Sequence, residues 1–282
     1  MNTGIRGRRR TAAVIATAGA LALSVLNAPA AQAKDTGIVV SNLVFNKGKP
    51  IVVGTSKVSE TPLTFNIALP AGYSTDNTGR WRIAPFLYRG SLKDVANGTG
   101  ENSLWTIPYT CYEQDSQRAR CEGTLFIDPH PQMEEADSNS DATKWKIGVH
   151  LALFPAGDGP VLAEEFESRS GTVSLRRAAK LSVADATPEP VAKGKKLTLK
   201  SRLTRANWTT KKNDGYAGSA VSLQFRAQGA TTFKTLKKVT TNSAGALSTT
   251  VTATADGFFR WVYYGNSVTG TATSGQDYID VR

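Results

Sequence analysis

The sequence predicts an all-β protein in which two tandem β-sandwich domains of immunoglobulin-like type follow a signal peptide. Short runs of β-branched and aromatic residues alternate with clusters of glycine, proline and asparagine, which is the pattern of strands joined by turns. No window of helical length shows a sustained apolar period of about 3.6 residues. Behind a leader of 33 residues, 282 − 33 = 249 residues remain, which suffices for two sandwiches.

The leader, residues 1–33, has the three parts of a signal peptide. Arginines between residues 6 and 10 precede the apolar run 11–26, and Ala31-Gln32-Ala33 supplies a small-residue cleavage site. The arginine pair is also compatible with the twin-arginine route, but Ala12-Ala13 stand where that signal has a stronger hydrophobic residue, which favours Sec export. We therefore expect a secreted protein, released or held at the cell surface, without integral membrane association once the leader is removed.

Charge divides the remaining chain into an N-terminal domain, residues 34–177, and a C-terminal domain, residues 178–282. The first carries 15 Lys+Arg and 17 Asp+Glu, or 15 − 17 = −2, and the second carries 15 and 6, or 15 − 6 = +9. Four leader arginines complete the net charge of +11. The division predicts that any contact with a polyanion lies in the C-terminal half, although a basic surface also serves solubility.

The N-terminal strands are expected where β-branched and aromatic residues cluster between turn signals. The turn Asn46-Lys47-Gly48-Lys49-Pro50 separates the first two of them. The expected strands are 38–45, 51–55, 64–69, 81–88 and 144–154.

Cys111 and Cys121 are the two cysteines of the chain, and in an exported protein they predict a structural disulfide. We expect them to face each other in a hairpin that turns at 115–117. That register places apolar pairs on the face of the disulfide. The pairs are Tyr109 with Gly123, Ile107 with Leu125, and Trp105 with Ile127, while Thr106, Thr110, Glu122 and Thr124 form the solvent face.

The C-terminal domain is expected to start after a linker at 184–190, which contains Pro188 and Pro190. Alternating apolar residues predict strands at 197–203, 221–225 and 247–251, with further strands at 258–264 and 278–281 and turns at 227–229 and 242–245. The strand 258–264 is apolar on both faces. We expect Phe259, Trp261 and Tyr263, or else Phe258, Val262 and Tyr264, to form the core. The other set is then covered by side chains of the same sheet or by the N-terminal domain, or it is left for a partner.

A family resemblance supports this architecture. The motifs Gly215-Tyr216-Ala217-Gly218, 221–226 and 257–265 resemble the immunoglobulin-like C-terminal domain of many secreted actinobacterial proteins. The N-terminal half, with its 48–55 segment and cysteine pair, is similar to an actinobacterial domain of unknown function. The resemblance implies fold and location, and it transfers no catalytic residue.

The segment 204–218 is the best candidate for ligand binding. Trp208 and Tyr216 offer rings on which a sugar can stack, and Lys211 and Lys212 attract phosphate or carboxylate. The structural alternative is that Trp208 and Tyr216 cap the open end of the core.

An acidic loop at 128–141 is the best candidate for a metal. Asp137, Asn139 and Asp141 have the spacing that begins a calcium loop, but Ala142 stands at the turn glycine and Gly148 at the bidentate glutamate. We expect a solvated loop, with a weak Ca²⁺ site as the alternative, and no cofactor. Together with His130 and the neighbouring Glu134 and Glu135, this loop also suggests a metal-assisted hydrolase, provided that these groups converge. His150 lies within an expected strand, where a packing role is favoured.

No nucleophile elbow, zinc helix or phosphate loop occurs, and the lysines are dispersed without a nucleic-acid motif. The sequence therefore favours a non-enzymatic attachment protein over the hydrolase. Its expected partners are a cell-wall polyanion, a polysaccharide or another secreted protein, and no nucleic acid.

Overall fold

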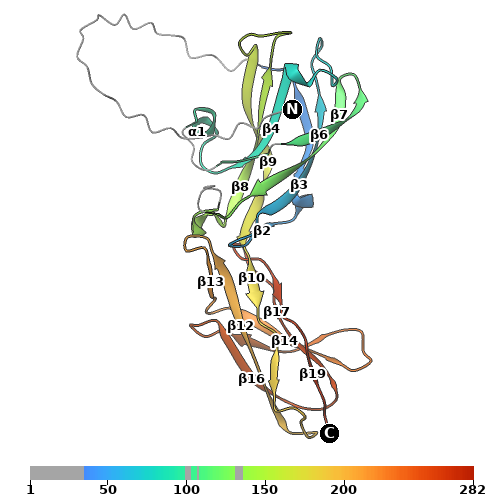
Figure 1. Cartoon of the computed structure of the whole chain (residues 1–282), viewed down its shortest axis with the longest axis vertical. Helices are drawn as coiled ribbons and strands as arrows, with labels where there is room; N and C mark the ends of the chain where they lie inside the picture. The colour runs from blue at the N-terminus through green and yellow to red at the C-terminus, as the bar shows by residue number, and fades with distance from the viewer. Residues whose placement is uncertain (1–34, 99–102, 107, 131–135) are drawn as a thin grey trace, which may run out of the picture.

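The computed structural model describes residues 35–98, 103–106, 108–130 and 136–282, so the leader predicted at 1–33 lies outside the described residues. The predicted all-β class is confirmed, because the described chain forms four β-sheets that pack in pairs (Figure 1). A short helix, α1 (Leu92–Ala96), lies beside the N-terminal pair.

The N-terminal sandwich is built from a four-stranded sheet and a five-stranded sheet. The first has the order β1-β3-β7-β6, with β1 (Val39–Phe45), β3 (Ser59–Ala68), β7 (Arg118–Ile127) and β6 (Tyr109–Asp115). The second has the order β2-β9-β8-β4-β5, with β2 (Ile51–Val53), β9 (Ala163–Arg177), β8 (Lys144–Leu153), β4 (Trp81–Tyr88) and β5 (Ser103–Trp105). The β2–β9 pair is parallel and the other pairs are antiparallel.

Alternation along the strands explains why the two sheets face each other. Leu63, Phe65 and Ile67 of β3 are at most 3% exposed and point into the same cluster as Trp145 and Val149 of β8. Each such side chain contributes about 1.5–3 kcal/mol when it leaves water, which outweighs the weak preference of any single residue for a strand.

The cysteine hairpin forms with the predicted register. Cys111 is bonded to Cys121, with a Cα–Cα distance of 4.0 Å, and Tyr109 lies opposite Gly123. A Cβ atom on Gly123 would approach the Tyr109 Cβ to 2.9 Å, so the tyrosine occupies the space that glycine leaves. Burial raises the pKa of Tyr109 to about 12. The pairing of Ile107 falls outside the described residues.

The predicted pair of Trp105 with Ile127 is wrong. Trp105 belongs to β5, which pairs with β4 in the other sheet, so that Trp105 lies opposite Phe86. Thr106 is not on a solvent face either, because it is fully buried and its amide donates to the Pro85 carbonyl at 3.0 Å. The chain belongs to one sheet at Trp105 and to the other sheet at Tyr109. A register extrapolated from the cysteine hairpin therefore does not hold at Trp105.

Removing the disulfide with Cys111→Ser and Cys121→Ser should lower the free energy of unfolding by about 2–3 kcal/mol, because the bond closes a short loop that is open in the unfolded chain. Urea denaturation followed by circular dichroism measures the change. Reduction of the unaltered protein should reproduce it, and coincident midpoints for the oxidised protein and the double variant would contradict a stabilising role.

The C-terminal sandwich also consists of two sheets. In the first, β12 (Lys196–Asn207) pairs with β10 (Ala179–Leu181), β11 (Asp185–Thr187), β13 (Lys212–Gly215) and β16 (Ala246–Thr252). In the second, the order is β15-β14-β17-β18, with β15 (Lys234–Thr240), β14 (Ala220–Ala227), β17 (Gly257–Tyr263) and β18 (Ala272–Thr273), and β19 (Asp277–Ile279) pairs with β17. Leu197, Leu199 and Leu247 from one sheet meet Leu223 and Trp261 from the other.

The strand that is apolar on both faces is largely covered by its own sheet. Phe259, Trp261 and Tyr263 are at most 5% exposed and form the core. On the other face, the Phe258 ring lies 5.1 Å from Tyr278 and beneath the Arg226 guanidinium, as the first alternative predicted, while Tyr264 stays 61% exposed.

The segment 184–190 is not the connection between the sandwiches. Residues 185–187 form β11, which pairs with β12, and Ala184 and Ala186 are buried in the C-terminal core. The chain passes from the first core to the second with only Ala178 between β9 and β10. The two prolines suggested a linker, but the alanines pack inside the sandwich.

Candidate functional site

The loop that follows β12 was the predicted ligand site, and the structure turns it toward the N-terminal sandwich. Trp208 is 0% exposed and belongs to the hydrophobic cluster of the N-terminal domain, together with Ala206. Its indole N–H donates to the Val53 carbonyl at 3.2 Å. Trp208 therefore caps a core, as the structural alternative held, but that core belongs to the other domain, and no ring face is open to a ligand.

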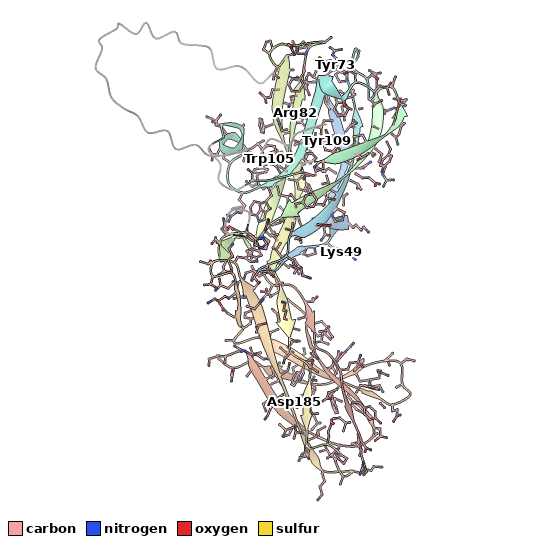
Figure 2. The ribbon with its side chains drawn as sticks, viewed as in Figure 1. Lys49, Tyr73, Arg82, Trp105, Tyr109 and Asp185 are labelled. Atoms are coloured by element: carbon pink, nitrogen blue, oxygen red, sulfur yellow. A yellow bond between two sulfur atoms is a disulfide. The ribbon has the colours of Figure 1, made fainter. Side chains whose placement is uncertain are left out.

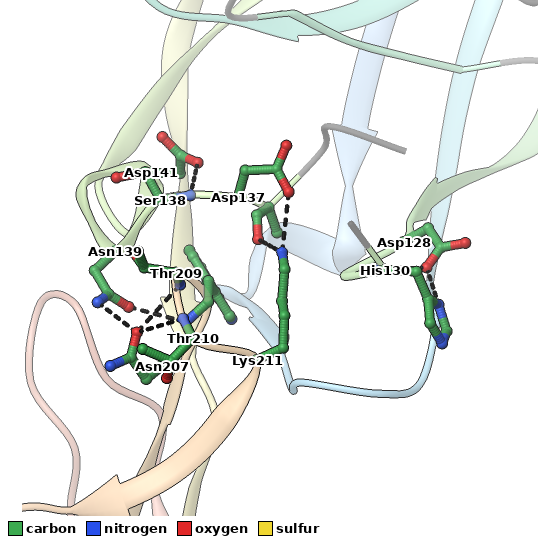
Figure 3. Close-up of polar contacts among 12 residues, drawn as sticks. Asp128, His130, Asp137, Ser138, Asn139, Asp141, Asn207, Thr209, Thr210 and Lys211 are labelled. Carbon is green, nitrogen blue, oxygen red and sulfur yellow. Dashed lines mark hydrogen bonds and ion pairs between the residues drawn. The ribbon is translucent and has the colours of Figure 1, made fainter. Parts of the chain in front are cut away.

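The acidic loop and the Trp208 loop meet each other (Figure 3). The Lys211 ammonium donates to the Asp137 carboxylate at 2.9 Å and to the Ala136 carbonyl at 3.0 Å. The Asn139 side chain accepts from the Trp208 amide at 3.0 Å and donates to the Asn207 side chain at 2.8 Å. These contacts join residues about seventy positions apart into a joint between the two sandwiches, which we call the interdomain joint.

The three candidate metal ligands point to separate partners. Asp137 is paired with Lys211 and Asn139 with Trp208, while Asp141 caps the 3-10 turn η3 (Asn139–Asp141) and forms an ion pair with Arg89 at 2.6 Å. Within the described ranges, no group of three or more His, Cys, Asp or Glu side chains is placed to hold a metal ion. Glu134 and Glu135 lie outside those ranges.

His130 is set apart from these carboxylates. Its ring pairs with Asp128, away from Asp137 and Asp141 (Figure 3). The backbone N–H of His130 lowers the pKa of Asp128, with smaller contributions from the imidazole. The condition for the hydrolase, that His130 and the loop carboxylates converge, is not met by the described residues; the hydrolase itself stays a prediction.

Tyr216 is held by neighbours rather than left open. The Arg205 guanidinium lies 3.9 Å above its ring, and the Asn266 amide donates to its hydroxyl at 2.9 Å. Burial raises the pKa of Tyr216, but hydrogen bonds from Thr269, Asn266 and Tyr263 bring it below its ordinary value. Lys212 is the one residue of the predicted set that is exposed, so a ligand role stays a prediction there.

A buried cation closes the same joint. Arg177 ends β9 and is 7% exposed, and its backbone pairs with the 268–270 loop through bonds of 3.0 and 2.9 Å. Burial lowers the pKa of Arg177, and the positive charge of Arg205 lowers it further. The interdomain joint thus combines the buried Trp208 side chain with polar contacts.

The exposed lysines of β15 form a basic surface that the sequence reasoning overlooked, because β15 itself was not predicted. Lys234, Lys237 and Lys238 lie on this edge strand, which pairs on one side only, with β14. In residues 178–282, all of which are described, the cations that form ion pairs are Lys211 and Arg282. Most of the positive charge of this domain is therefore unneutralised by the protein.

An aromatic cluster on the outer face of β4, β5, β8 and β9 was also missed. Trp105, labelled in Figure 2, is 38% exposed. Its ring lies against Phe86, beside His150 and Phe166. The members come from four strands, so no local motif marks them.

A cavity of about 280 Å³ opens at the far end of the C-terminal sandwich. Its lining includes Leu197, Phe225, Leu236, Val251 and Phe259, and none of the lining side chains is ionisable. It offers apolar volume without acid–base chemistry. Among the described residues, no helix has the length and apolar character needed to cross a membrane.

Comparison with known proteins assigns no family. No family model and no curated protein matches the chain. Among solved structures, a superoxide reductase described as putative from Thermotoga maritima is 15% identical over 38% of this chain and 87% of its own, with a TM-score of 0.28. The D00-D0 domain of intimin is 11% identical over 86% of this chain and 99% of its own, with a TM-score of 0.26, and the Bacillus anthracis TIE protein is 7% identical over 89% and 58%, with 0.18. These similarities are too low to assign a ligand, and the actinobacterial resemblance stays an expectation.

Proposed function

We propose that this chain is a non-enzymatic, extracellular attachment protein whose C-terminal sandwich binds a polyanion of the cell envelope. The observation that carries the proposal is the surplus of cations in residues 178–282, which contain 15 Lys+Arg and 6 Asp+Glu. Among these cations, only Lys211 and Arg282 form ion pairs with acidic side chains of the described residues. Unpaired exposed cations attract a polyanion through the summed field of the domain, even when no single lysine binds tightly.

The basic edge of β15, formed by Lys234, Lys237 and Lys238, is the best-defined contact surface. The three lysines share one short strand that contains no acidic residue. Lysines on an edge strand also prevent pairing with a second sheet, which accounts for their position. Edge protection needs few charges, however, and it leaves the net charge of the whole domain unexplained.

The chemistry of the partner follows from the expected location. The disulfide is stable in an oxidising compartment, and the leader predicts export. Phosphate-rich polymers such as wall teichoic acid are polyanions of that environment. A neutral polysaccharide or a secreted protein is the competing partner, and salt separates these alternatives because exposed charge pairs are screened.

The test is retention of residues 34–282 on purified Gram-positive cell walls, with and without their teichoic acid, across a salt series. Replacing Lys234, Lys237 and Lys238 by Gln should weaken retention at least tenfold, since each cation near an anionic surface contributes about 1 kcal/mol. The matched control replaces three exposed N-terminal lysines, Lys47, Lys49 and Lys57, by Gln and removes the same charge. Equal retention on stripped walls, or equal effects of the two triple variants, would contradict the proposal.

A further inference from the structure

A flat aromatic surface lies on the outer face of the N-terminal five-stranded sheet. The Trp105 ring stacks on the Phe86 ring with centroids 4.4 Å apart and planes 28° apart. Phe86 is 0% exposed, whereas Trp105 is 38% exposed. One face of the indole is therefore supported from below, and exposed area remains on a ring that lies nearly parallel to its support.

Gly148 makes this arrangement possible. It lies directly opposite Phe86 in the β4–β8 pair, and a Cβ atom at this position would come within 2.4 Å of the phenyl ring. Because β8 has no side chain at this position, the Phe86 ring lies flat over the strand, and the Trp105 indole stacks on it. An alanine would have to lift Phe86 and, with it, Trp105.

Hydrogen-bonding groups border the exposed indole. His150 lies edge-on to it at 6.2 Å and stacks on Phe166 at 4.4 Å. The His150 Nε2 atom is 2.7 Å from the Glu164 carboxylate, whose side chain is 51% exposed. About half of the Glu164 side chain is open to solvent, and His150 connects this acceptor to the aromatic cluster around Trp105.

We propose that Trp105, with His150 beside it and Glu164 hydrogen-bonded to His150, binds a pyranose ring of a β-linked polysaccharide. A pyranose has one face of C–H bonds, which suits an indole, and a rim of hydroxyls, which suits a carboxylate. An anionic polymer is disfavoured here, because Glu164 is exposed and residues 34–177 carry a net charge of 15 − 17 = −2. A protein partner would need a broader apolar area than one supported indole provides.

This site is separate from the basic edge of β15, so the two proposals can fail independently. The lysines predict retention that salt removes, whereas stacking and hydrogen bonds to a neutral sugar are little affected by salt. Binding at Trp105 should therefore persist at salt concentrations that release the protein from an anionic wall.

The experiment is titration of residues 34–282 with cellohexaose, chitohexaose and β-1,4-mannohexaose in high salt, by calorimetry and by the indole N–H resonance of Trp105. At least one sugar should bind and shift that resonance. Trp105→Ala should weaken binding roughly tenfold or more, comparable to the loss of one aromatic ring that stacks on a nucleobase, and Glu164→Gln should weaken it as well.

Two further variants keep the result interpretable. Trp105→Phe retains a smaller ring and should keep part of the affinity even if the alanine variant is poorly folded. Tyr112→Ala removes an exposed aromatic ring from the other sheet, 57% exposed, and should leave binding unchanged. Absence of binding to all three sugars in high salt, or equal binding by Trp105→Ala and the unaltered protein, would overturn the proposal.

Discussion

Replacing Trp208 by alanine should lower the free energy of unfolding by about 3–5 kcal/mol, the usual loss for a large aromatic side chain removed from a core. The ring is 0% exposed within the N-terminal cluster, and its N–H bond to the Val53 carbonyl would also be lost. Urea denaturation measures the loss. Hydrogen exchange should show increased opening of the N-terminal strands, although the substituted residue lies in the C-terminal half.

Trp208→Phe is the matched variant, because it fills most of the volume but donates no hydrogen bond, and it should fall between the alanine variant and the unaltered protein. Tyr264→Ala, at a ring that is 61% exposed, should change stability little. An unchanged urea midpoint for Trp208→Ala, accompanied by loss of wall retention, would instead restore the ligand role that the sequence suggested for this tryptophan.

Gly245→Ala should lower the free energy of unfolding by about 3 kcal/mol or more, because a strained backbone and a backbone clash act together. Gly245 has a φ of +77°, and a Cβ atom there would lie 2.2 Å from the Leu203 carbonyl oxygen and 2.7 Å from the Tyr216 nitrogen. The same carbonyl accepts the Tyr216 N–H at 2.9 Å. If the backbone moves to avoid the added Cβ atom, this hydrogen bond between β12 and the residue after β13 is lost. Thermal unfolding detects the change.

Gly229→Ala is the control for this glycine. Its φ of +79° matches that of Gly245, but nothing lies within 4 Å of the added Cβ atom. Only the conformational strain of about 1–2 kcal/mol should remain. Equal destabilisation by the two substitutions would show that the backbone contact at Gly245 adds nothing.

Strands with a clear apolar alternation were predictable, and strands dominated by charge were not. The expected strands 38–45, 81–88 and 144–154 correspond to β1, β4 and β8. β9 and β15 were missed, since β9 has charged outward positions and a register shift opposite Lys146/Ile147, and β15 is a lysine-rich edge. Both strands form because neighbouring strands supply their hydrogen bonds.

The candidate sites show the same distinction at the level of side chains. The Trp208 segment and the acidic loop were considered separately, the first as a candidate ligand site or a cap on a core and the second as a solvated loop or a weak Ca²⁺ site. Their contacts in the interdomain joint join Asn139 to Trp208 and Lys211 to Asp137, residues 69 and 74 positions apart in the chain. No local pattern indicates such pairs, because each loop taken alone has the composition of a solvent-exposed loop that could bind a ligand.

The sequence by itself determined the all-β class, the cysteine pairing and the register next to the disulfide, because each depends on alternation between neighbours in the chain or across one hairpin. The core face of β17 was left open between two sets of residues, and packing against the β12 sheet decided it. Only the tertiary structure decided that Trp208 is buried in the core of the other domain and that Trp105 is the exposed tryptophan. Trp208 gains its free energy of burial next to Val53, 155 positions away, and Trp105 lies flat because Gly148 leaves room beneath Phe86. The chemistry of a tryptophan is the same in both places, and the surface that folding brings against it decides whether it stabilises a core or faces solvent.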